Sequence, residues 1–157
     1  MAQTETEKHD IGVAGETLFS AQALGDYMEK RRQAERAKTQ ERELEEAKAR
    51  EEQIKRLMVP VEITQERLAG FMLRVRQVAE QGQKDLLVLR FPSDLCTDRG
   101  RAINNTEEGW DKTLVGVPAQ MVEVWEKELK PLGYGLRAEV IDYPHGMPGD
   151  IGLYCHW

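Results

Sequence analysis

The sequence has no run of apolar residues approaching the roughly 18 that a membrane-spanning helix needs. The N-terminal region also lacks the basic start and apolar stretch of a signal peptide, because Glu5, Glu7 and Asp10 stand where cations would be needed. These two absences predict a soluble, cytoplasmic protein that makes no membrane contact.

Cysteine is scarce, with Cys96 and Cys155 as the two in the sequence. Two cysteines cannot build the disulfide framework that replaces a core in small secreted proteins, and their separation matches no clustered metal-binding pattern. His145 and His156 do not complete a metal site with Cys155, because adjacent strand residues point to opposite faces. We therefore expect reduced thiols, no metal site and no cofactor.

The common enzyme motifs are also missing. The sequence contains no glycine-rich phosphate loop followed by Lys and Ser or Thr, no His-Glu-x-x-His, no Cys-x-x-Cys and no Gly-x-Ser-x-Gly. This absence favours a non-enzymatic function over an enzymatic one.

Charge is abundant but unevenly distributed. The 28 acidic and 22 basic residues give a net charge of -6, so we do not expect binding to nucleic acid. Residues 29–58 are the exception, because eighteen of these thirty residues are charged, ten of them basic, and neither Gly nor Pro interrupts them. Ala, Gln and Leu supply most of the remainder, and this composition predicts a long helix.

The predicted helical arm covers residues 20–58. Ser20 is a suitable N-cap, and Pro60 cannot continue the hydrogen-bond ladder. Acid-first pairs four residues apart, such as Glu51 with Lys55, support an exposed helix. At 1.5 Å per residue the arm is roughly 58 Å long, more than a compact domain of this size can bury. It therefore projects into solvent or lies along another surface.

The heptad pattern of the arm is compatible with three different surroundings of the helix. The first core position holds Ala37, Leu44, Glu51 and Met58, and the second holds Gln40, Ala47, Ile54 and Val61. Six of these eight residues are apolar, but alanine buries little surface and Glu51 opposes tight packing. The arm is a solvated single helix, a coiled coil with a second copy, or a helix docked on a different protein.

An apolar segment precedes the charged residues. Residues 1–19 are predicted to be an irregular tail, and apolar side chains continue into the first turns of the arm. The candidate partner-binding residues are Leu18, Phe19, Leu24, Tyr27 and Met28. Either the segment is a floppy tail with scattered apolar residues, or residues 11–58 bind another protein or a second copy of the chain.

Residues 59–157 predict a compact α+β domain with a small three- or four-stranded sheet covered by helices. Alternating apolar residues suggest a short strand over 59–63, and Thr64 caps a helix that runs to Gly82. The apolar run from Leu86 to Leu89, followed by Phe91, is typical of a central strand buried on both faces.

The second half of this domain begins with a predicted helix over 93–105, capped by Ser93. Another helix starts at Pro118 and ends near Gly133. Alternation over 136–141 and 151–157, separated by a turn-rich segment, predicts an antiparallel hairpin.

One polar cluster follows the strand that ends at Pro92. Its members are Asp94, Cys96, Asp98, Arg99 and Arg101. Free backbone N–H groups at a helix start and two arginines suit a phosphate or carboxylate ligand, and an aspartate suits a general base. Local structure explains the same residues without a ligand, because Ser93 and Asp94 are ordinary capping residues, Asp98 can pair locally with Arg101, and the cysteine can be a small buried side chain.

The sequence therefore favours a non-enzymatic assembly or adaptor subunit, in which the helical arm contacts a protein partner. The alternative is a small α/β enzyme or anion-binding module with a site around residues 93–101.

Overall fold

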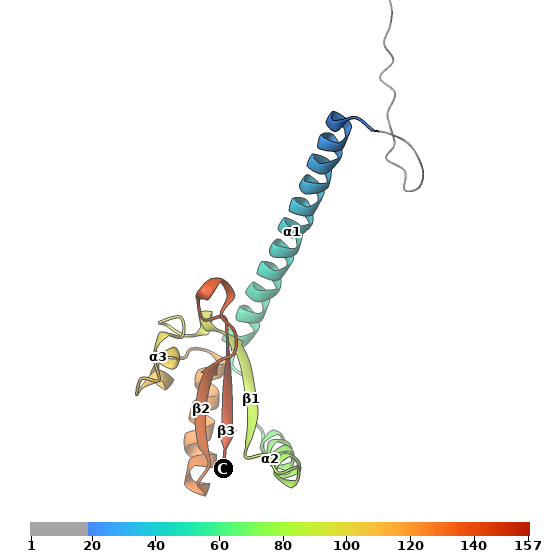
Figure 1. The fold of residues 1–157 in the computed structure, drawn as a ribbon. Helices are drawn as coiled ribbons and strands as arrows, with labels where there is room; N and C mark the ends of the chain where they lie inside the picture. The colour runs from blue at the N-terminus through green and yellow to red at the C-terminus, as the bar shows by residue number, and fades with distance from the viewer. Residues whose placement is uncertain (1–18) are drawn as a thin grey trace, which may run out of the picture. The chain divides into compact units, whose positions relative to one another are not determined.

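In the computed structural model, which describes residues 19–157, α1 (Ala21–Met58) is a helix of 38 residues with no buried side chain (Figure 1). It starts where the sequence predicts, because the Ser20 hydroxyl accepts a hydrogen bond from the Ala23 backbone N–H. It ends shortly before Pro60, as expected. No helix in the described residues is both long and apolar enough to cross a membrane.

The chain divides into two units, and the division lies inside α1, between Ala47 and Lys48. The last turns of α1 therefore belong to the second unit, where Ile54 and Leu57 pack against the hydrophobic core. The domain start at residue 59 stays a prediction, although residues that precede it, Ile54 and Leu57, pack against the core.

A three-stranded antiparallel sheet lies at the centre of the second unit. Its strands are β1 (Asp85–Pro92), β2 (Gly135–Val140) and β3 (Asp150–His156), in the order β1-β3-β2 (Figure 1). The pairing of β2 with β3 confirms the predicted hairpin, and the sheet with its helices confirms the α+β class.

The strand predicted from Leu86 to Phe91 lies at an edge of the sheet, so its expected central place was wrong. β3 is central, because it pairs with both of the other strands. The β1 register shifts between Leu87 and Leu89, and Leu87 is 38% exposed. The continuous apolar run therefore reflects an irregularity around Val88 on a partly covered edge strand, rather than burial on both faces.

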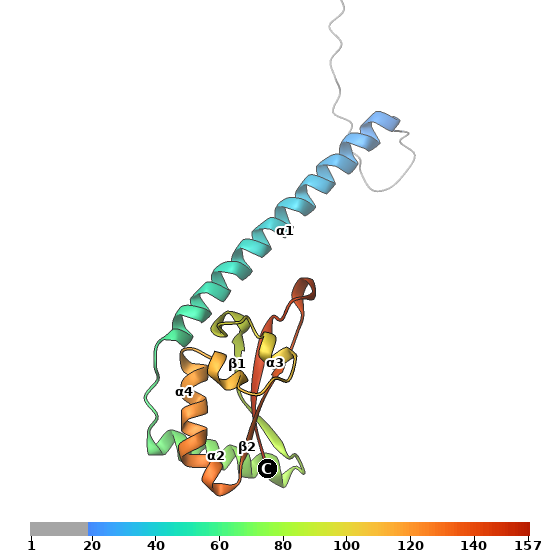
Figure 2. The same cartoon turned by 90° about the vertical axis from the view of Figure 1, so that its left-hand side faces the viewer.

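Alternation along β3 separates a core face from an outer face. Ile151, Leu153 and Cys155 on the core face are fully buried, and Phe91 of β1 is buried opposite Ile151. The helices α2 and α4 lie on this face of the sheet (Figure 2). The sheet therefore contributes one face to the core and presents the other to solvent.

Two predicted helices are confirmed. α2 (Gln65–Glu80) begins at Thr64, whose hydroxyl accepts a 3.2 Å hydrogen bond from the Arg67 backbone N–H. α4 (Val117–Val124) has Pro118 in its first turn and continues as a π-helical turn (Trp125–Leu129). Proline suits the first turn, because its missing N–H would have no partner inside the helix there.

Two other expectations need correction. Residues 59–63 form no strand; the Gln120 side chain bonds both the N–H and the carbonyl of Val61 in place of a neighbouring strand. The helix expected over 93–105 is broken into a 3₁₀ turn (Ser93–Leu95) and the short α3 (Arg101–Asn104). Cys96 forms a bridge with Leu114 between these two pieces, which interrupts the helical backbone.

The end of α1 meets the start of α4 at Gly116. This glycine has φ 66° and ψ −144°, a region that side chains exclude, and a Cβ there would collide with the Leu57 carbonyl oxygen. Gly116→Ala should lower the free energy of unfolding by roughly 3 kcal/mol or more.

Gly109→Ala is the matched control, because Gly109 also has positive φ but a Cβ there meets open space. It should cost roughly 1–2 kcal/mol. Chemical denaturation of both variants measures the difference, and equal losses would show that the contact with Leu57 does not constrain the fold.

Truncation tests the contribution of the last turns of α1. A chain that starts at Lys48 should unfold in one cooperative thermal transition, because it retains Ile54 and Leu57. A chain that starts at Val59 should have a free energy of unfolding lower by roughly 2–4 kcal/mol, since two half-buried apolar side chains are lost. Equal stability of the two chains would contradict this packing.

Candidate functional site

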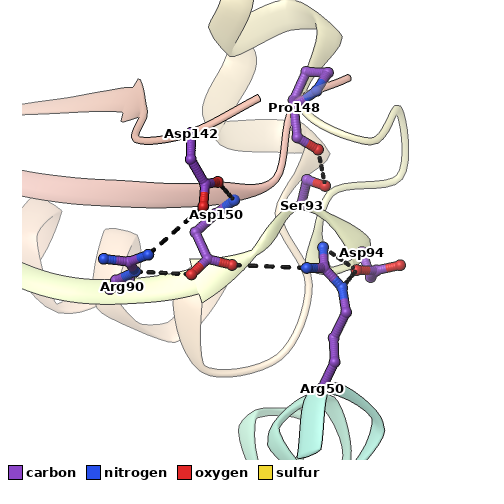
Figure 3. A network of polar contacts seen from close by, with 7 residues as sticks. All are labelled: Arg50, Arg90, Ser93, Asp94, Asp142, Pro148 and Asp150. Carbon is purple, nitrogen blue, oxygen red and sulfur yellow. Dashed lines mark hydrogen bonds and ion pairs between the residues drawn. The ribbon is translucent and has the colours of Figure 1, made fainter. Parts of the chain in front are cut away.

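The best-defined polar cluster in the second unit is centred on Arg50, in the last turns of α1 (Figure 3). Arg50 Nη2 lies 2.8 Å from Asp94 Oδ2, and its Nε donates to the same oxygen at 2.9 Å. Arg50 Nη1 lies 3.9 Å from Asp150 Oδ1. One guanidinium thus joins α1 to the end of β1 and the start of β3.

A second guanidinium extends this network along the sheet. Arg90 Nε donates to Asp150 Oδ2 at 2.8 Å, and Arg90 Nη2 lies 3.8 Å from Asp142 Oδ2. The hydrogen bond to Asp150, together with its charge, raises the pKa of Arg90. Asp142 Oδ1 accepts the Asp150 backbone N–H, which fixes the loop between β2 and β3.

The arrangement pairs its charges internally. Two arginines face three aspartates, so each guanidinium already has a carboxylate partner. The side chains are 21–50% exposed, so solvent screens these pairs and each stabilises the fold only modestly. The network therefore joins α1 to the end of β1 and to the start of β3.

Asp94 and Asp98, both candidate ligand residues, have different partners in the structure. Asp94 belongs to the Arg50 network. Asp98 Oδ1 accepts the Gly100 backbone N–H at 3.0 Å, and its Oδ2 accepts the Ala102 N–H at 2.7 Å. The anion at the start of α3 is therefore the Asp98 side chain of the chain itself.

The two candidate arginines also differ in their surroundings. Arg101 Nη1 lies 3.3 Å from Glu107 Oε1, so the local pair with Asp98 considered from the sequence does not form. Arg99 is exposed and has φ 56°, inside the tight turn before Gly100. The structure thus gives three of the four charged candidates internal partners, and ligand binding around residues 93–101 stays a prediction.

Cys96 is 3% exposed, between the turn after β1 and Leu114. Burial, followed by repulsion from the Asp98 carboxylate, raises the pKa of the thiol to about 12. Cys155 is fully buried on β3, and burial raises its pKa too. Both thiols are protonated at neutral pH, the form in which a thiol is a poor nucleophile.

The candidate partner-binding residues at the start of α1 are large and exposed. Phe19 is 47% exposed, Tyr27 45% and Met28 54%, and Leu24 is similar. Leu24, Tyr27 and Met28 lie three and four residues apart, on one side of the helix. Leu18 lies outside the described residues.

The heptad pattern over residues 37–61 does not survive as one continuous stripe. Val61 lies beyond the end of α1, and Ile54 packs against the core of its own unit. Those two positions are therefore unavailable to a second helix. Self-pairing through the preceding part of α1 stays a prediction.

The sequence did not reveal the network of Arg50 and Arg90, because their carboxylate partners lie 44 and 60 positions away. No periodic pattern connects residues at such separations. Within the described part of the chain, no group of three or more His, Cys, Asp or Glu side chains is placed to hold a metal ion.

Comparisons with protein-family models, curated proteins and solved structures found no match.

Thiol labelling checks the environment of Cys96. At pH 8, alkylation of Cys96 by iodoacetamide in the folded protein should be slower than in the unfolded chain by roughly a thousandfold or more, because the raised pKa depletes the thiolate. Peptide mass spectrometry separates Cys96 from Cys155. Comparable rates in the folded and unfolded chains would contradict the buried position.

Proposed function

We propose that this protein is a non-enzymatic assembly or adaptor subunit that binds another protein through the start of α1. The observation that supports this proposal is the exposure of four large apolar side chains close together in sequence, which we call the apolar cluster: Phe19, two residues before α1, and Leu24, Tyr27 and Met28 in its first turns. No residue of α1 is buried, so these side chains have no core of their own. An apolar side of a helix with this spacing suits a hydrophobic groove on a partner.

The apolar cluster outweighs the charges of the helix as a source of affinity. Each of the four side chains is already about half covered, so burial of the remainder contributes roughly 1–2 kcal/mol before ordering costs. An exposed ion pair contributes only about 0.2–1 kcal/mol. The partner contact should therefore depend on Phe19 and Tyr27 more than on any charged pair.

The charged part of α1 supports this role by maintaining the helix. Its ion pairs, such as Arg31 with Glu35 and Arg42 with Glu46, join side chains within the same helix. Such pairs stabilise an exposed helix without a partner surface. In this proposal they set the reach of the arm, while the apolar cluster at its start recognises the partner.

The proposal is tested by co-purification of the full chain from its native source, with quantitative mass spectrometry of the bound proteins. Phe19→Ala combined with Tyr27→Ala should lower the affinity for a specific partner by about tenfold or more, because both side chains lose their apolar contacts. The remaining domain should keep its melting temperature, since neither residue is buried in it.

The control is a charge exchange, Glu51→Lys with Lys55→Glu, which reverses an exposed pair of 3.0 Å on the same helix. It should leave partner recovery unchanged. Retained recovery by the aromatic double variant, together with loss in the charge exchange, would place the contact in the charged stretch. Binding to a second copy alone would replace the adaptor role with self-association.

A further inference from the structure

A cavity of about 410 Å³ is lined by side chains of α2, of α4 and of the core face of the sheet. Ligand-binding cavities in proteins have volumes of roughly 300–1,000 Å³ and mainly apolar walls. Here α2 contributes Phe71, α4 contributes Met121, and β2 contributes Leu136.

Two backbone irregularities face this cavity. Val88, where the register of β1 shifts, is one lining residue. Trp125 and Leu129, the first and last residues of the π-helical turn that follows α4, are two others. Both β-bulges and π-helical turns occur often next to functional sites, where they redirect side chains.

The Trp125 ring is held in place at the cavity wall. Its Nε1 donates a 2.9 Å hydrogen bond to the Tyr134 carbonyl, so the polar edge of the indole is satisfied within the protein. The ring thus lines the cavity with its polar edge satisfied, and Lys130 Nζ lies 5.3 Å from the ring centroid in a cation–π contact.

Arg67 and Arg74 are the charged members of the cavity lining, and both come from α2. They lie two helical turns apart on the side of α2 that also carries Phe71. Arg67 Nη1 donates to the Glu62 carbonyl at 3.0 Å, which anchors that side chain at the cavity. The acidic residues Glu123 and Glu128 line a neighbouring depression instead.

We propose that this cavity binds a small amphipathic carboxylate. Its aliphatic or aromatic body fills the apolar space, and its carboxylate pairs with the guanidinium groups of Arg67 and Arg74. A guanidinium binds a carboxylate through two parallel hydrogen bonds, and because both arginines are exposed, the carboxylate lies at the solvent-facing rim of the cavity. The site is separate from the start of α1, so it does not depend on the adaptor function.

Calorimetric titration of the full chain with decanoate and with decanol tests this proposal. Decanoate should bind with a stoichiometry of one. Decanol should have an affinity lower by about tenfold or more, because it lacks the charge that pairs with arginine. No saturable decanoate binding, or a stoichiometry well above one, would overturn the proposal.

Matched variants locate the bound molecule. Arg67→Ala combined with Arg74→Ala should weaken decanoate by about tenfold or more and leave decanol unchanged, because only the carboxylate contacts are lost. Arg76→Ala removes a cation from the same helix, at an exposed pair with Glu80, and should bind decanoate as the original chain does.

Filling the cavity gives an independent measurement. Val88→Phe should abolish binding of both compounds, provided that circular dichroism shows the same cooperative melt as the original chain. If Val88→Phe melts differently, Met121→Trp serves the same purpose on the opposite wall. Decanoate affinity that is unchanged in the arginine double variant, or in a folded cavity-filling variant, would overturn the assignment.

Discussion

Burial of the core side of β3 is the interaction on which the domain depends. Ile151, Leu153 and Cys155 are fully buried, and β3 supplies the hydrogen-bond partner for both other strands. Without this strand β1 and β2 have no contact within the sheet, and α2 and α4 have no continuous surface to cover. The polar network around Asp150 then fixes the start of the same strand.

A sheet with one buried face explains much of the remaining architecture. The core side needs a layer of helices, and α2, α4 and the last turns of α1 provide it. The cavity beside Trp125 lies between two members of this layer, α2 and α4, and the sheet. The preceding part of α1 contributes no buried side chain to the layer.

Most elements of the fold could be predicted from local patterns in the sequence. Ser20, Thr64 and Pro118 marked helix starts correctly because caps and fixed dihedrals act within a few residues. The predicted central place of β1 in the sheet was wrong, because an apolar run does not indicate which strands pair with it on either side. The partners of Asp94 and Asp98 also escaped prediction, since choosing between an arginine 44 positions away and a nearby backbone N–H requires the tertiary structure.

The strand order also dictates when the domain can assemble during synthesis. β1 and β2 emerge first, yet each pairs only with β3, which is translated after both. Until then the apolar side of β1 and the unpaired edges of both strands are available to other chains, a state that favours aggregation. Pairing in the sheet is therefore complete only after β3 has been synthesised.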